Sequence, residues 1–399
     1  MIIYNKKSLE NLRLIEQTKI WKEKQLLSES LFEKIKGKYI NDLYTPNFFI
    51  RTGLFLFTAI LIGASLGLVT LITYGDSGSQ TGLLIRILIY AIITGFTTEI
   101  VIKEKKFFRA GVDDALQYAT VGLLISVIGI FFDNLNHNSE SYYDNTDYTI
   151  QILAFSLPIL IFFAIRYVDR LLTALAFGIF IYIVFYIVSN AGNIGKAICP
   201  FVICIISFLI YQLVKKYGYV ERRLLWKDNF NILELLSLLT LYLSVNYFVV
   251  RELNAILNNE YSSTQIPLAW IFYITTTVIP LLYIYFGIIK KDRLQLQLGM
   301  MLITLAVFTF KYYFSLGHHE ITITLAGIIM IGVAWLVNKL LKTPKVGLTL
   351  DKDVLEKEFN LTDAEALVIA ETMGKDSAQQ DDFTFGEGNF GGGGSGGKF

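Results

Sequence analysis

Long runs of apolar residues, separated by short polar connections, dominate the chain from about residue 52 onward. Each run holds about 20 residues, enough for a helix to cross the ~30 Å hydrocarbon core of a bilayer. The runs are too long and too uniformly apolar for barrel strands, and lipid offers no partners to an open backbone. The pattern predicts about ten membrane-spanning helices, at residues 52–73, 83–102, 115–132, 149–168, 171–188, 196–214, 232–250, 266–289, 294–314 and 321–341.

Composition supports the same class. Hydrophobic residues make up 54% of the 399 positions and charged residues 17%, whereas soluble domains carry about 25% charged residues. We therefore expect an all-α, polytopic integral membrane protein whose main partner is the lipid bilayer, with no nucleic-acid partner. The first apolar run begins near Thr52, after a charged segment, and is expected to act as an uncleaved signal anchor.

Lysine and arginine residues alternate between the connections. With the N-terminus in the cytoplasm, they fall in the head, the tail and the even-numbered connections. The opposite connections are acidic, and only four basic residues lie elsewhere, near the outer ends of spans: Arg86, Lys196, Arg251 and Lys311. Basic residues are retained on the cytoplasmic side of a membrane. The alternation predicts a bacterial cytoplasmic (inner) membrane protein with both termini in the cytoplasm.

The ends of the chain differ from its apolar centre. Leu31, Phe32 and Ile35 follow helical spacing, and Ser30-x-x-Glu33 is a capping-box pattern, so a helical hairpin is expected near the N-terminus. A second capping box at Thr362-x-x-Glu365 precedes a glycine-rich end. We expect a cytoplasmic helical headpiece (1–50), a transmembrane domain (51–342), a short cytoplasmic helical segment (343–374) and a disordered tail (375–399).

The headpiece allows two interpretations, packing against the membrane domain or binding a cytoplasmic protein partner, and the tail could also bind such a partner. The segment Trp21-x-x-x-x-Leu26-Leu27-Ser28, followed by Tyr39 and the first span, resembles a bacterial family of uncharacterised predicted membrane proteins. In that family a short helical headpiece precedes many closely spaced spans. The resemblance implies this architecture and no chemistry.

Two apolar runs carry proline near their middle. Thr275, Thr276 and Thr277 precede Pro280 in one of them, and Ser156 precedes Pro158 in the other. Proline cannot donate the helical hydrogen bond, so a kink is expected at each. Transporters use interrupted helices to expose carbonyls and hydroxyls at the midplane, whereas other membrane helices tolerate kinks patched by nearby hydroxyls. The first interpretation predicts a polar site between these two spans.

Ionisable residues inside the apolar runs are the second group of candidates: Glu99, Glu234, Arg86 and Lys311. An intramembrane carboxylate suggests a proton-coupling group. Alternatively, each acid lies about one or two helical turns from a basic residue, Lys103 or Lys227, and pairs with it near the membrane surface. Asn246 lies deeper and is expected to form hydrogen bonds between helices.

No cofactor, metal site or catalytic residue is expected. Cys199 and Cys204 lie on different faces of one predicted helix and are interpreted as small apolar residues. All three histidines fall in acidic outer connections, but without a spacing typical of a metal site. The preferred function is a non-enzymatic membrane scaffold or sensor; the alternative is a secondary transporter or channel for a small polar solute or cation, and an enzyme is least favoured.

The predicted topology can be tested with single cysteines, after Cys199 and Cys204 have been replaced. In outer-membrane-permeabilised cells, cysteines at Ser139, Asn258 and Ser315 should react with an impermeant thiol reagent. Cysteines at Ser30, Gly218 and Ser377 should react only after the inner membrane is opened. Reversal at any position would show that the spans are miscounted.

Overall fold

A computed structural model describes residues 2–23, 26–73, 80–138, 148–218, 225–260 and 263–313, with a few positions between 328 and 339. These residues belong to one compact unit, Met1–Asp351; a second unit, Lys352–Phe399, lies outside the described residues. Most of the last predicted span and the segments after residue 343 fall outside as well. Within the described ranges the chain is helical, with one isolated bridge between Tyr44 and Phe107 and no strand.

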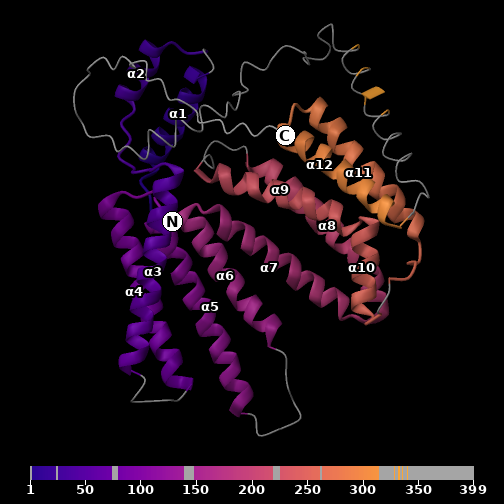
Figure 1. Cartoon of the computed structure of the whole chain (residues 1–399), viewed down its shortest axis with the longest axis horizontal. Coiled ribbons are helices and arrows are strands. Elements are labelled where there is room, and N and C mark those ends of the chain that lie inside the picture. The colour runs from indigo at the N-terminus through magenta and orange to yellow at the C-terminus, as the bar shows by residue number, and fades with distance from the viewer. Residues whose placement is uncertain are drawn as a thin grey trace, which may run out of the picture. The chain divides into compact units, whose positions relative to one another are not determined.

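Twelve helices are described, and the course of the chain through them can be followed in Figure 1. The headpiece holds α1 (Lys6–Glu23) and α2 (Glu29–Lys38). A first group follows, consisting of α3 (Phe48–Thr73), α4 (Gln80–Lys105), α5 (Val112–Asn138) and α6 (Thr149–Tyr167). After α7 (Arg170–Ser189) comes a second group of α8 (Gly192–Gly218), α9 (Lys227–Ser244), α10 (Tyr247–Leu257), α11 (Ala269–Ile289) and α12 (Arg293–Tyr313).

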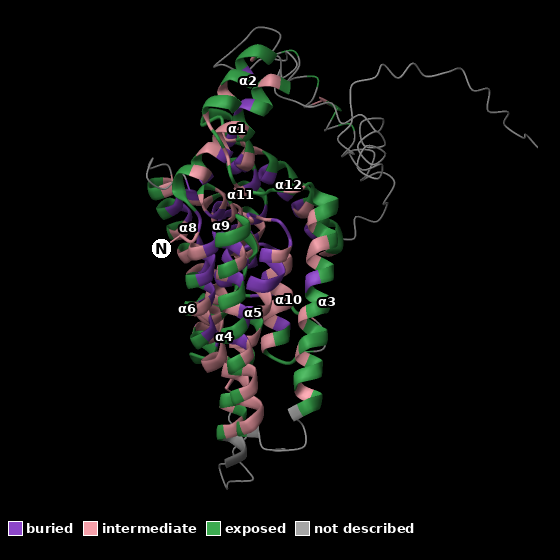
Figure 2. Cartoon of the chain, turned by 90° about the vertical axis from the view of Figure 1, so that its left-hand side faces the viewer, coloured by how far each residue is buried: buried purple, intermediate pink, exposed green. Residues whose placement is uncertain are grey.

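Eight of the described helices are long and apolar enough to cross a membrane, or nine if α9 and α10 form one span. They correspond to the first nine predicted runs, each displaced by a few residues at its ends. Figure 2 shows exposed residues along the outer faces of the helices and buried residues where helices meet. Large apolar side chains such as Leu71 and Ile72 of α3 are exposed, as in a helix that faces lipid. The described chain is that of an all-helical membrane protein.

Helix α7 joins the two groups. In the first group α5 contacts α3, α4 and α6, and in the second α9 contacts α8, α10, α11 and α12. Helix α7 packs against α6 on one side and against α8 and α9 on the other. The two groups therefore meet along α7.

Close backbone approach depends on glycine at the start of α5. Gly111 has a φ of +96°, and a Cβ at this position would lie 2.1 Å from the carbonyl oxygen of Arg51 in α3. No other residue fits both the left-handed backbone and this spacing. Gly111 thereby sets α3 against the loop that precedes α5.

The predicted span 232–250 is broken in the structure. Helices α9 and α10 are bent by 70° at Val245 and Asn246. The Asn246 side chain accepts hydrogen bonds from the N–H groups of Phe248 (3.0 Å) and Val249 (3.3 Å), and so caps α10. Asparagine interrupts the helix because its side chain competes for backbone donors. The sharp bend lies here, whereas α6 and α11 continue through Pro158 and Pro280 as single helices.

Candidate functional site

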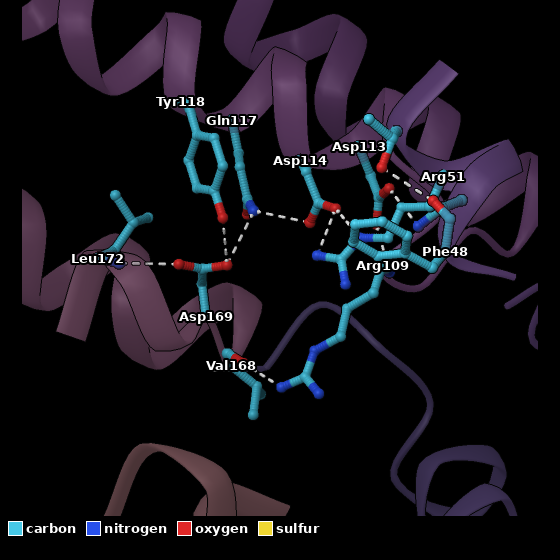
Figure 3. A network of polar contacts seen from close by, with 12 residues as sticks. Phe48, Arg51, Arg109, Asp113, Asp114, Gln117, Tyr118, Val168, Asp169 and Leu172 are labelled. Carbon is cyan, nitrogen blue, oxygen red and sulfur yellow. Dashed lines mark hydrogen bonds and ion pairs between the residues drawn. The ribbon is translucent and has the colours of Figure 1, made fainter. Parts of the chain in front are cut away.

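Polar and charged side chains gather where α4 ends, α5 and α7 begin and α9 starts. Figure 3 shows the part of this group around α5 and α7. We call the whole group the junction cluster: Arg13, Arg51, Arg109, Asp113, Asp114, Gln117, Tyr118, Asp169, Arg170 and Asp228.

Two aspartates of the cluster shape the loops that hold it. The Asp113 carboxylate accepts hydrogen bonds from the backbone N–H groups of Arg109 and Ala110, both at 2.8 Å, and thereby closes the turn before α5. The Asp169 carboxylate accepts from the N–H of Leu172 at 2.8 Å and caps the N-terminus of α7. A negative side chain is also favoured there by the helix dipole. Val168, with a φ of 54°, turns the chain from α6 into this cap.

Three buried carboxylates have hydrogen-bond donors close by, which are neutral for Asp113 and Asp169 and include a guanidinium for Asp114. Asp169 accepts from the Tyr118 hydroxyl at 2.8 Å and from the Gln117 amide at 3.3 Å. The Asp114 carboxylate accepts from the Arg51 guanidinium, with N–O distances of 2.8 and 2.7 Å. Asp113 is 1% exposed and Asp114 2%, so each needs the hydrogen bonds it receives. Their hydrogen bonds connect α3, α5 and the start of α7.

Asp228, in the first turn of α9, is the carboxylate of the cluster that three arginines contact. Its carboxylate lies 2.9 Å from the guanidinium of Arg109, 2.9 Å from that of Arg170 and 3.9 Å from that of Arg13. The three arginines come from the α4–α5 loop, the start of α7 and the headpiece helix α1. Three segments distant in sequence therefore meet at one carboxylate, which is carried by a fourth segment, α9.

The neighbours of Asp228 also connect the two helix groups. The Trp226 indole donates to the carbonyl oxygen of Ile165 at 3.0 Å. The Asn229 amide donates to the carbonyl oxygen of Ala164 at 3.0 Å and to the Thr173 hydroxyl at 2.9 Å. The start of α9 is thus bonded to the end of α6 and the beginning of α7, using carbonyls that the helix end leaves free.

The headpiece is docked on this junction. Leu9 and Leu12 of α1 are buried, and the ring of Tyr4 meets Phe108 edge-on with centroids 5.0 Å apart. Arg13 donates to the carbonyl oxygen of Leu225 beside its contact with Asp228. Burial raises the pKa of the nearby Glu16 carboxyl above its ordinary value, although Arg109 beside it acts in the opposite direction. Helix α1 therefore packs against the membrane domain, in line with one of the two interpretations of the headpiece.

The residues of the predicted midplane site lie on two helices that are not packed directly together. Ser156 is buried and donates to the carbonyl oxygen of Ile152 in its own helix at 2.6 Å. Among the described helices, α6 and α11 are not in extensive contact; α6 packs on α7, and α7 is connected to α11 through α8, α9 and α10. Two-sided packing of α7 between the groups thus separates Ser156 and Pro158 from the threonines and Pro280 on α11.

Two threonines of α11 form hydrogen bonds with the backbone of the broken helix. Thr276 is fully buried, and its hydroxyl oxygen accepts from the N–H of Tyr247 at 2.9 Å. Thr275 donates to the carbonyl oxygen of Val245 at 2.8 Å, while Thr277 donates to its own helix at Tyr273. Asn246 donates to Tyr242 in α9 and to Thr309 in α12, and the second bond is of the kind between helices that the sequence predicts. These side chains satisfy the backbone groups that the break sets free.

The ionisable candidates lie apart from one another. Glu99 pairs with Lys103 at 3.2 Å, as expected, and also with Arg166. Glu234 binds Lys215 of the adjacent α8 at 2.5 Å, and Lys215 also binds Asp292 at 2.6 Å.

The expected partner of Glu234, Lys227, is therefore replaced by one from α8, because Glu234 is buried in the face of α9 that packs on α8. Arg86 is half-buried in α4 and Lys311 is exposed on α12. Among the described residues no group of three or more His, Cys, Asp or Glu could hold a metal ion.

A cavity of about 350 Å³ lies beside the break in α9–α10. It is bounded by α8, α10 and the segment before α11, and Lys196, Ser244 and Asn254 contribute polar atoms to its mostly apolar wall. The Lys196 amine donates to the carbonyl oxygen of Leu257 at 2.8 Å and to the Asn258 side chain at 3.1 Å.

Sequence reasoning missed the acidic half of the junction cluster. A usable signal was present, since Asp113, Asp114, Asp169 and Asp228 lie at predicted basic, cytoplasmic ends of spans. Asp113 and Asp114 also share helical spacing with Gln117 and Tyr118, which puts polar groups on one face of an apolar helix. The convergence with Asp169 and Asp228, by contrast, depends on the packing of distant helices.

Replacing Asp228 by Asn should loosen the headpiece. The arginines lose their shared counter-charge, and charge-assisted hydrogen bonds contribute about 1.5–3 kcal/mol each. We expect amide hydrogen exchange in α1 to accelerate by at least about tenfold, the effect of ~1.4 kcal/mol. Asp292→Asn, which removes a carboxylate paired with Lys215 and distant in sequence from the headpiece, is the matched control. Equal exchange in α1 of both variants would contradict this role of Asp228.

Comparison with known proteins adds no family to this description. No family model matches the chain, and no curated protein or solved structure matches it either. The resemblance of the headpiece to a bacterial membrane family stays a hypothesis. What the chain does must therefore be argued from the junction cluster, the broken helix and the exposed surfaces.

Proposed function

We propose that the protein is a non-enzymatic scaffold or sensor of the bacterial cytoplasmic membrane, with its headpiece in the cytoplasm. The observation that carries this proposal is the headpiece itself, which is anchored at the junction cluster and yet presents an apolar surface. Trp21, Leu26 and Leu31 are 41%, 58% and 50% exposed. Exposed apolar groups on a helical element outside the membrane are typical of a protein interaction site.

The connection between this surface and the membrane domain supports a sensing role. Helix α1 buries Leu9 and Leu12 against the junction, and Arg13 contacts Asp228. A partner bound to α2 would act on α1, which packs against α2 and contacts both helix groups. Binding free energy could then bias the arrangement of the groups, which is the physical requirement for transmission between sites.

The cytoplasmic orientation rests on the charges around the same ends of the helices. Lys103, Arg166 and Lys215 lie in the last turns of α4, α6 and α8. Glu99 pairs with the first two, and Lys215 pairs with Asp292 between α11 and α12. These ends carry the basic excess that marks the cytoplasmic face, and α1 packs on the same junction.

Site-directed photo-crosslinking tests the scaffold proposal. A photoreactive phenylalanine analogue at Leu31 should give a discrete protein adduct in native membranes, and Leu26→Ser should weaken it severalfold by removing exposed apolar area of the headpiece. The same analogue at the exposed Lys36, on another face of α2, is the positional control. Adducts of equal yield at both positions, or to lipid alone at Leu31, would contradict a protein partner at this surface.

A second candidate function, binding and transport of a small polar solute, is favoured by the break in α9–α10 beside the 350 Å³ cavity. Transporters form substrate sites at discontinuous helices. The hydroxyls of Thr275 and Thr276 are already bonded to the break. Lys196, Asn254 and Ser244 would therefore be the groups that meet a solute.

Cysteine accessibility separates this candidate from a static pocket. With Cys199 and Cys204 replaced, Ser244→Cys should react with a small impermeant thiol reagent from either side of the membrane if the cavity alternates its access. Ser65→Cys, in the middle of the long apolar helix α3, should stay unreactive. Labelling of Ser244→Cys from one side only, or no labelling, would exclude transport through this cavity.

A further inference from the structure

A second cavity, of about 430 Å³, lies along the seam between the two helix groups. Its walls come from α6, α7, α8 and α9, with Ile161, Phe180, Ile210 and Leu233 among the apolar residues that line it. Ile161 is 44% exposed, so the cavity opens at the surface of the helices as a crevice. Its volume lies within the range of sites that hold small molecules. An apolar crevice at the side of a membrane helix bundle suits an acyl chain.

One end of this crevice is polar. Trp226, Asn229 and Thr173 line that end, and each stands in or next to the first turns of α7 or α9. Asn229 is 6% exposed, and its amide nitrogen is bonded to α6 and α7 while its Oδ1 atom has no hydrogen-bond partner in the described structure. A buried acceptor without a donor is costly. A hydroxyl group entering this end would supply the donor.

Two exposed basic side chains are neighbours in sequence of the residues at the polar end. Arg170 lies one turn before Thr173 on the same face of α7, and its side chain is 53% exposed even though it contacts Asp228. Lys227, between Trp226 and Asp228, is also exposed. A guanidinium has five donors, so Arg170 can bind a phosphate and Asp228 together. Helix α7, which begins at Arg170, is long enough to cross a bilayer, and α9, which begins at Lys227, is so together with α10. Both basic residues therefore stand at headgroup level.

We propose that the crevice binds one anionic glycerophospholipid with hydroxyl groups in its head, of the phosphatidylglycerol type. An acyl chain occupies the apolar crevice, the phosphate meets Arg170 and Lys227, and a headgroup hydroxyl donates to Asn229. The inference rests on the chain residing in a bilayer and not on the scaffold proposal. The lipid would bridge the two helix groups at the same place as Trp226 and Asn229.

Trp226 lines the crevice and reports its occupancy. In the full chain with Trp21, Trp270 and Trp335 replaced by Phe, its fluorescence is measured in nanodiscs containing a small fraction of lipid with brominated acyl chains. Brominated phosphatidylglycerol should quench Trp226 more strongly than brominated phosphatidylcholine, by at least about fivefold in apparent affinity, since each basic residue near the surface contributes this much. A chain that keeps only Trp270, which is 60% exposed at the start of α11, should show no preference between the lipids.

Charge variants identify the headgroup site. Arg170→Gln should lower the preference for phosphatidylglycerol by about fivefold, whereas Lys216→Gln, which removes an exposed charge at the end of α8, should leave it unchanged. Ile161→Phe narrows the crevice from its exposed side and should weaken quenching of Trp226 by both lipids.

Equal quenching of Trp226 by the two lipids would overturn the proposal without any charge variant, even if Arg170→Gln failed to fold. An equal preference at Trp270 would also overturn it, because it would indicate general enrichment of anionic lipid. Equal effects of the Arg170 and Lys216 variants would overturn it as well.

Discussion

The fold depends on one constraint, the sharing of the Asp228 carboxylate by three arginines from separate segments. Arg109 and Arg170 hold it at 2.9 Å, and Arg13 reaches it from the headpiece. Charged groups at the end of a membrane domain need partners when packing buries them. By supplying the partner from α9, the chain fixes where the second helix group meets the first, and Trp226 and Asn229 extend the same contact through free carbonyls of α6.

Much of the architecture is readable from sequence, because a bilayer imposes a minimum length on every apolar helix. The first nine runs correspond to helices in the structure, and the spacing around Phe32 indicates the headpiece helix α2. The site was less accessible to this reasoning. Asp113 and Asp228 are ordinary loop-end acids in sequence, and only the packing of α7 between two groups brings them into one cluster. The proline positions are limited for a related reason, since neighbouring helices decide whether a kink opens a site.

At the broken helix, side chains form hydrogen bonds with the backbone groups that lose their helical partners. A bend of 70° between α9 and α10 frees donors and acceptors in an apolar setting. Asn246 takes two of the donors, and Thr275 and Thr276 on α11 take a carbonyl and a further donor. Polar residues that resemble a solute site in sequence thus bond the backbone at the bend, and the 350 Å³ cavity lies beside it.

The contact between Arg13 and Leu225 joins residues that are 212 positions apart. At a synthesis rate of about 5–20 residues per second, the second of these residues is made ~10–40 s after the first. Until then α1 has no Asp228 to bind, and the apolar side chains of Leu9 and Leu12 lack a part of their final surroundings. The headpiece therefore cannot complete its docking until six spans have been made. Docking requires that the first helix group and the start of the second are in place.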